Sequence, residues 1–213
     1  MTPERASKLY EVAMCRQFNL TVILENVHDT HNIGAVLRSC DSVGITEVFV
    51  VFTHLHLIQK QRIKLGKRTT AGTRKWLKVH FYTDLESCFQ EVRSRYDTIL
   101  GTHISEDTKS LYDLDLTQSV ALLFGNENEG ISEDALKHCD GNFLVPQVGM
   151  VQSLNISVAC AVSVFEAYRQ RNAKGMYEHN TTASPEDLQA KFDEYIEIHE
   201  SGLNNKTIRK KEP

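Results

Sequence analysis

Three polar segments of the sequence carry residue types that could bind a ligand or act on a reacting oxygen. In the first, Asn32 and Arg38 lie six residues apart in a stretch with helical spacing. Because a helix turns by about 100° per residue, the two side chains meet only if the long arginine reaches back towards the helix start. Arg38 could then bind a phosphate or stabilise an oxyanion. Alternatively, Asn32 caps the helix and Arg38 is a solvated surface charge, and the spacing leaves both open.

The second segment is an acidic loop that follows an apolar run. Glu127 and Glu129 lie between Gly125 and Gly130. A pyrophosphate site would need a G-x-G-x-x-G spacing or a P-loop lysine, and two carboxylates would repel the phosphates. The loop therefore suits an adenosine that carries a cationic sulfonium better than a phosphate-rich nucleotide.

The third segment is a turn, with Pro146 and Gly149, that leads into a helix start rich in small polar residues. Unpaired backbone amides at such a start could hold an adenine edge or a carboxylate. The alternative is that Ser153 only caps the helix.

Strand and helix patterns alternate along the chain and place these segments after strands. Apolar runs predict strands at residues 20–24, 47–52, 98–102, 120–125 and 142–146. Helical spacing predicts helices at residues 4–17, 32–43, 85–95, 132–138, 153–171 and 184–200. This alternation predicts an α/β fold with a parallel sheet and helices on both faces. Ligands of open α/β sheets bind at the carboxyl ends of the strands, where the three segments fall.

Composition divides the chain into three parts. We expect an N-terminal helical extension at residues 1–19, a main domain at residues 20–175, and a C-terminal helical extension with a basic tail at residues 176–213. The helix at residues 153–171 is apolar enough to be largely buried. The tail from Lys206 onwards is expected to be disordered.

The net charge of −4 excludes a protein coated in positive charge, so any nucleic-acid contact must come from a local basic patch. No acidic residue lies between Glu47 and Asp84, and a solvated surface is the alternative reading of this stretch. The RNA-binding candidates are Lys64, Lys67, Arg68, Arg74 and Lys75.

Cysteine and histidine patterns bear on compartment and metal content. The five cysteines are scattered singly, which predicts reduced thiols. No apolar run is long enough to span a bilayer, so we expect a soluble, cytoplasmic protein. No histidine pair has helical spacing with a nearby acidic ligand, so we expect no metal.

The three segments, in this order, resemble the motifs of the SpoU branch of the knotted SPOUT RNA methyltransferases, over about Leu20 to Arg171. Within that branch the chain is similar to the TrmH group of tRNA guanosine 2′-O-methyltransferases. The strings that carry this likeness are Arg16-Gln17, Gly72 to Trp76, Gly149 to Ala159 and Arg169-Gln170-Arg171. Two departures are Gly34, where TrmH proteins commonly have serine, and Gln147, where methionine is usual.

The resemblance implies S-adenosylmethionine-dependent methylation of a ribose 2′-hydroxyl in RNA, most often a D-loop guanosine of tRNA. It also implies a C-terminal trefoil knot and a homodimer that completes each site. By matching position, the cofactor contacts are Thr102, Gly125, Val145 and Leu154. The positions associated with catalysis or site geometry are Arg38, Asn32, Glu127, Ser153 and Asn155.

Several alternatives remain open at this stage. Family mechanisms make Arg38 a general base, but arginine holds its proton tightly, so Arg38 could instead stabilise the forming alkoxide. The target could be ribosomal RNA, or the protein could be a knotted RNA-binding protein without catalysis. A nicotinamide-dependent Rossmann enzyme is disfavoured because no glycine fingerprint follows residues 20–24.

Overall fold

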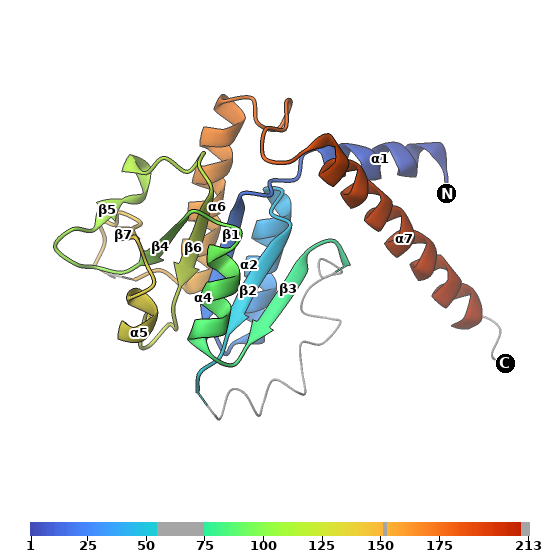
Figure 1. Cartoon of the computed structure of the whole chain (residues 1–213). Helices are drawn as coiled ribbons and strands as arrows, with labels where there is room; N and C mark the ends of the chain where they lie inside the picture. The colour runs from blue at the N-terminus through green and yellow to red at the C-terminus, as the bar shows by residue number, and fades with distance from the viewer. Residues whose placement is uncertain (55–74, 151–152, 210–213) are drawn as a thin grey trace.

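The fold is a seven-stranded sheet covered by helices, in a computed structural model that describes residues 1–54, 75–150 and 153–209 (Figure 1). Every strand pairs in parallel, in the order β3-β2-β1-β6-β4-β7-β5. The strands are β1 (Leu20–Glu25), β2 (Glu47–Val51), β3 (Lys78–Tyr82), β4 (Thr98–Thr102), β5 (Lys109–Ser110), β6 (Val120–Phe124) and β7 (Gly141–Leu144). The predicted parallel α/β sheet is confirmed.

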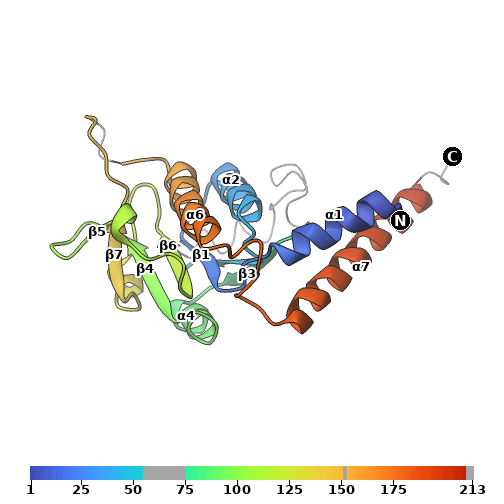
Figure 2. The ribbon, with the colours of Figure 1, turned by 90° about the horizontal axis from the view of Figure 1, so that it is seen from above.

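Helices cover both faces of the sheet, as predicted. They are α1 (Pro3–Met14), α2 (Thr30–Ser42), α4 (Leu85–Arg93), α5 (Glu133–Leu136), α6 (Ile156–Ala173) and α7 (Pro185–Arg209), with a 3-10 turn η2 (Leu111–Asp113). Figure 2 shows α2 and α6 together on one face and α4 on the other. Because β1 and β6 lie inside the sheet with both faces covered, every residue in them is buried.

Two strands were missed by the sequence analysis, and both lie at the edges of the sheet. β3 has no fully buried residue, and β5 has only two residues. An edge strand covered on fewer sides does not need the continuous apolar run that marks a central parallel strand. Their sequences therefore lack the signal that predicted the other five.

The ends of several helices differ from the predicted ones. Asp29 caps α2, so Asn32 lies inside the helix and is not its cap. Asn155 caps α6, so this helix begins at Ile156 rather than at residue 153, and Ser153 does not cap it. α7 continues to Arg209, past the predicted start of the tail at Lys206; residues 210–213 lie outside the described part.

Helix α6 is less buried than its composition predicts. Cys160, Val164 and Ala167 pack against the sheet. On the other side, Val158 and Phe165 remain 46% and 49% exposed. Helix α6 thus has two apolar faces. Within one chain, the sheet covers one of them and the other is exposed.

The two terminal helices pack against each other beside the sheet (Figures 1 and 2). Arg16, which follows α1, is only 1% exposed and ties this pair to α2. Its guanidinium donates to the Tyr195 hydroxyl at 2.6 Å and to Asp41 Oδ1 at 2.6 Å. Among the helices in the described ranges, none is long and apolar enough to cross a membrane.

A second buried arginine, Arg171, lies near Arg16, beside the chain segment that precedes β1. Arg171 donates to the carbonyl oxygens of Leu116 and Gln118 and to the side chains of Gln17 and Asn19. All these acceptors are neutral, and burial lowers the pKa of Arg171 to about 10. Arg171 and Gln17, two residues that carry the TrmH likeness, therefore join the chain before β1 to the end of α6.

A partly buried carboxylate, that of Glu47, gives a testable dependence of stability on pH. Glu47 accepts hydrogen bonds from Arg95, His80 and Tyr96 at 2.6, 2.8 and 3.0 Å. Burial alone would raise the pKa of Glu47, but the hydrogen bonds from Arg95 and His80 outweigh it and lower the pKa. Because the pKa of Glu47 is lower in the folded state than in the unfolded chain, the ionised carboxylate stabilises the fold at a pH above its unfolded-state pKa of about 4.3. This stabilisation is lost as the pH falls through the folded-state pKa.

We expect Glu47→Gln to lower the free energy of unfolding at pH 7 by about 1.5–3 kcal/mol, as for a hydrogen bond to a charged group. Its stability should also fall less steeply than that of the wild type on acidification. Urea unfolding between pH 7 and pH 3 measures both effects. An unchanged slope in the variant would contradict the assignment.

Candidate functional site

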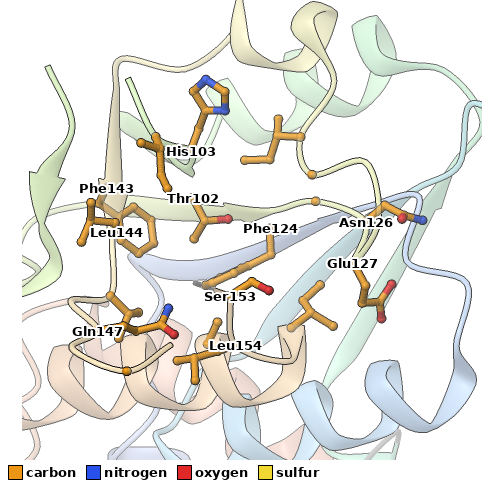
Figure 3. A pocket seen from close by; sticks show the side chains of 18 residues that line it. Thr102, His103, Phe124, Asn126, Glu127, Phe143, Leu144, Gln147, Ser153 and Leu154 are labelled. Atoms are coloured by element: carbon orange, nitrogen blue, oxygen red, sulfur yellow. The ribbon is translucent and has the colours of Figure 1, made fainter. Parts of the chain in front are cut away.

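A pocket of about 740 Å³ lies at the carboxyl edge of the sheet, between the loops after β4, β6 and β7 and the start of α6 (Figure 3). Thr102, Gly125, Val145 and Leu154, the four residues matched to cofactor contacts, all line it. Its other lining residues are His103, Ile104, Phe124, Asn126, Glu127, Gly130, Ile131, Phe143, Leu144, Gln147, Gly149, Ser153, Ile156 and Ala159. Two of the three segments singled out from the sequence, the acidic loop and the turn before α6, therefore contribute to one pocket, whereas Asn32 and Arg38 of the first segment do not line it.

The pocket is built mainly from strand ends and apolar side chains. Thr102 ends β4, and its hydroxyl donates to the Leu123 carbonyl of β6 at 3.2 Å, which fixes the two strand ends together. Val145 follows β7 directly. Of the described lining residues, only Glu127 carries a carboxylate, and none is a lysine or arginine.

Gly125 allows the loop after β6 to fold back on itself. A Cβ at this position would lie 2.1 Å from the Gly130 carbonyl carbon and 2.3 Å from the Ile131 nitrogen. Such contacts are far inside van der Waals distance, and the atoms are backbone that cannot swing away. Asn126 and Gly130 also exchange two backbone hydrogen bonds, at 2.8 and 2.9 Å. The tight loop wall therefore requires glycine at residue 125.

Glu25, a residue that the sequence analysis missed, anchors the far end of this loop. It is 1% exposed at the end of β1, and its carboxylate accepts from the Ser132 amide at 3.0 Å and the Ser132 hydroxyl at 2.5 Å. Ser132 in turn caps α5. A carboxylate at the end of a buried apolar strand is the one signal in the sequence that could have identified it.

Asn32 joins two of the other residues matched to catalysis, Glu127 and Asn155. Its amide Nδ2 donates to Glu127 Oε1 at 2.5 Å, and its Oδ1 accepts from Asn155 Nδ2 at 3.2 Å. Asn155 Oδ1 accepts from the Ser157 amide and so caps α6. A polar chain of Glu127, Asn32 and Asn155 therefore connects the pocket loop, α2 and α6. Ser153 lines the pocket beside it.

Arg38 lies apart from this chain. It is exposed on α2 and does not line the pocket. Within the part of the chain that the structure describes, its guanidinium has no hydrogen bond or ion pair. In the described part of the chain, the Arg38 side chain therefore has no hydrogen bond to Asn32, Glu127, Ser153 or Asn155.

Asn26 and Asn126, also missed from the sequence, hold the loops after β1, β2 and β6 together. Asn26 has a left-handed backbone, with φ of 52°, and its side chain bonds twice to Thr53. Asn126 Nδ2 donates to the Asn26 carbonyl at 2.9 Å. The two partners are 100 residues apart in the sequence, so only the fold reveals the contact.

Four of the five predicted RNA-binding residues lie outside the described ranges: Lys64, Lys67, Arg68 and Arg74. Lys75 is described and exposed. With Lys78 and Glu194 it lines a second hollow of about 430 Å³ between β3 and α7. The basic patch stays a prediction.

Comparison with known proteins identifies the family. The sequence model of the SpoU rRNA Methylase family matches residues 19–165. The chain belongs to the SpoU methylase family. This span includes the carboxyl-edge pocket and the polar chain, so the SpoU match covers the residues described above.

Relatives and solved structures agree with this SpoU assignment. The tRNA (guanosine(18)-2′-O)-methyltransferase of Thermus thermophilus is 41% identical, over 83% of this chain and 88% of its own length. The Escherichia coli protein of that name is 34% identical, over 90% and 81%. The solved A. aeolicus TrmH/SpoU tRNA modifying enzyme matches with a TM-score of 0.79 and 30% identity, over 93% and 96%.

A further solved structure includes a cofactor. The SpoU methyltransferase AviRb of Streptomyces viridochromogenes, in complex with AdoMet, matches with a TM-score of 0.61 and 26% identity, over 74% of this chain and 60% of AviRb. This SpoU chain is accordingly an RNA methyltransferase, as the family and the relatives' names support.

The pocket glycines supply a matched pair of variants. We expect Gly125→Ala to weaken S-adenosylmethionine binding more than tenfold, because the new methyl group forces the loop after β6 out of position. Gly149→Ala is the control, since a Cβ there meets no protein atom within 4 Å. Isothermal titration calorimetry measures both. Equal affinities in the wild type and Gly125→Ala would contradict this role of the loop.

Proposed function

We propose that this protein transfers a methyl group from S-adenosylmethionine to the 2′-oxygen of guanosine 18 in the D-loop of tRNA. The relatives of that name span most of the chain at 34–41% identity. The observation that carries the proposal is the carboxyl-edge pocket, which is lined by the four matched cofactor positions and flanked by the polar chain of Glu127, Asn32 and Asn155.

The residues of the pocket fit S-adenosylmethionine. The absence of lysine and arginine from its described lining disfavours a phosphate-rich nucleotide, and Glu127 suits a cationic group. Phe124, Phe143 and Leu154 offer apolar surface for an adenine. Thr102, Gly125, Val145 and Leu154 would hold the cofactor, largely through backbone groups. When bound, S-adenosylmethionine supplies a methyl group made electrophilic by the sulfonium.

The polar chain would orient the ribose. Glu127 uses Oε1 to accept from Asn32, while its Oε2 accepts from no residue that the structure describes. Oε2 is therefore available to a ribose hydroxyl, and the bond from Asn32 holds the carboxylate in place. Such alignment of a reacting oxygen can contribute several kcal/mol to lowering a barrier.

Arg38 would act on the charge of the attacking oxygen. Its exposed guanidinium is solvated, which favours a cation that stabilises the forming 2′-oxyanion over a neutral base, with water removing the proton. Because Arg38 is away from the pocket of its own chain, this role requires a second subunit.

The uncovered face of α6 supports a homodimer that completes each site. Val158, Phe165 and Tyr168 follow helical spacing on α6 and are 46%, 49% and 37% exposed, and Leu154, just before the helix, is 36% exposed. Leu154 also lines the pocket. A second copy packed on this stripe would lie next to the pocket, so Arg38 of the partner subunit could reach it.

We further propose a C-terminal trefoil knot, a division of the chain into three parts, a basic RNA-binding stretch and a cytoplasmic location. β7 lies between β4 and β5, although β5 directly follows β4 in the chain, and this insertion supports a C-terminal trefoil knot. The separate packing of α1 against α7 supports the division at residues 1–19, 20–175 and 176–213. The basic stretch with Lys64, Lys67, Arg68, Arg74 and Lys75 would bind RNA phosphates. A tRNA substrate would fit an enzyme of the cytoplasm.

Ribosomal RNA is the second candidate substrate. The 23S rRNA (guanosine-2′-O-)-methyltransferase RlmB of Xanthomonas campestris is 35% identical, but over 71% of this chain and only 59% of RlmB. The relatives acting on tRNA cover more of both chains. A non-catalytic RNA-binding role is disfavoured by the intact polar chain.

Methyl transfer tests the proposal directly. We expect tritium from labelled S-adenosylmethionine to enter unmodified tRNA at a D-loop guanosine. Arg38→Ala should reduce the rate about 100-fold or more, as for the loss of an oxyanion-stabilising group, while cofactor affinity stays unchanged. Label in ribosomal RNA instead would support the second candidate. No transfer to either RNA by the wild type would overturn the proposal.

The α6 stripe yields a separate prediction about assembly. We expect Phe165→Glu to shift the protein from dimer to monomer in analytical ultracentrifugation and to abolish methyl transfer, because a carboxylate would be buried in an apolar contact. Tyr112→Glu, at another exposed aromatic residue away from α6, is the control. A monomeric wild type, or a fully active monomeric variant, would contradict the shared site.

A further inference from the structure

His28 is an exposed side chain that is nevertheless held in place. It follows β1, and its Nδ1 lies 3.3 Å from the amide Nδ2 of Asn126, which lines the pocket. An exposed histidine is usually free to rotate, so this bracing needs a reason. The imidazole of His28 has no part in the methyl transfer proposed above.

The hydrogen bonds of Asn126 determine which His28 nitrogen carries the proton. Asn126 Oδ1 accepts from the backbone amides of Asn128 and Glu129 at 2.8 and 3.3 Å, which fixes the orientation of the amide group. One hydrogen of Nδ2 is donated to the Asn26 carbonyl at 2.9 Å. The other is left for His28, so Nδ1 must accept and the proton of the neutral ring is on Nε2.

Hydrogen bonds hold the two loops that carry His28 and Asn126 in place. Asn26 is 3% exposed and bonds to Thr53, and Asn126 exchanges two backbone hydrogen bonds with Gly130. Among the described residues, no atom accepts from His28 Nε2. The structure therefore presents one oriented hydrogen-bond donor at the rim of the pocket.

The charges around this donor indicate what it would bind. Asp29, Glu127 and Glu129 lie in the same two loops, and residues 26–31 and 125–132 contain no lysine or arginine. A phosphate would be repelled by these carboxylates, whereas an uncharged acceptor on a nucleobase would not. Asn126 and Glu127 lie on the same side of the pocket in Figure 3, where the target nucleotide must enter if Glu127 orients its ribose.

We propose that His28 is a specificity-determining residue whose Nε2–H donates to the O6 carbonyl oxygen of the target guanine. This inference rests on the proposed function. Guanine has an acceptor oxygen at position 6, where adenine has an amino group that can only donate. A donor fixed by Asn126 would therefore favour guanosine over adenosine at the methylated position.

Two amide substitutions separate the two ring nitrogens. His28→Gln places an amide donor near the position of Nε2, whereas His28→Asn reaches only about as far as Nδ1. We expect His28→Asn to lower kcat/KM for a tRNA transcript roughly tenfold, as for the loss of one hydrogen bond, and His28→Gln to restore most of it. On a transcript with adenosine at that position, the low kcat/KM should not fall. The ratio of kcat/KM for guanosine to kcat/KM for adenosine should therefore decrease in His28→Asn and not in His28→Gln. Cofactor affinity and the unfolding midpoint should be unchanged in both variants.

His179→Asn, which removes another exposed imidazole on the connection between α6 and α7, is the matched control and should behave as the wild type. A wild type that methylates guanosine, with His28→Asn unchanged in rate and ratio, would overturn the role of His28 alone. Equal losses in His28→Asn and His28→Gln would also overturn it, because they would indicate packing rather than donation. A wild type that methylates no guanosine would overturn the proposed function and this inference together.

Discussion

The hydrogen bonds of the Asn32 side chain are the contact on which the site depends. This one amide is bonded to Glu127, 95 residues later, and to Asn155, 123 residues later. Such a junction exists only because β6 pairs beside β1 in the sheet and α6 packs beside α2 on one face. Parallel pairing brings the carboxyl ends of the strands to one edge, and Asn32 then fixes the loops that emerge there.

The rest of the chain holds that edge in place. Arg171 is buried among neutral acceptors and ties the end of α6 to the chain before β1, while Glu25 ties the loop after β6 to the end of β1. Buried charged groups are costly unless every donor and acceptor is satisfied. Here the hydrogen bonds are satisfied across segments that are remote in sequence, so the cost of burial is offset and the loops are held in one arrangement.

Much of the fold could be predicted from the sequence, because β1, β2 and β6 are almost entirely buried and mostly apolar, and β4 and β7 keep a short apolar core between their neighbours. The edge strands β3 and β5 lack that signal. Helix α6 begins later than predicted because Asn155, not Ser153, supplies the cap. The resemblance to a family supplied the cofactor positions, and all four line one pocket. It could not show that Arg38 lies away from that pocket within one chain. Asn26, Asn126 and Glu25 were missed because their partners are about 100 residues away, beyond the reach of any local pattern.

Asn32 and Glu127 are expected to act as one unit in orienting the ribose. A double-mutant cycle measures this most directly, with Asn32→Ala, Glu127→Ala and the double variant compared by single-turnover methyl transfer to tRNA at saturating S-adenosylmethionine. If the two side chains form one hydrogen-bonded unit, the double variant should be scarcely slower than the slower single variant, with a coupling free energy of about 1 kcal/mol or more. Rate losses that simply multiply in the double variant would show that the two side chains act independently, contrary to this expectation.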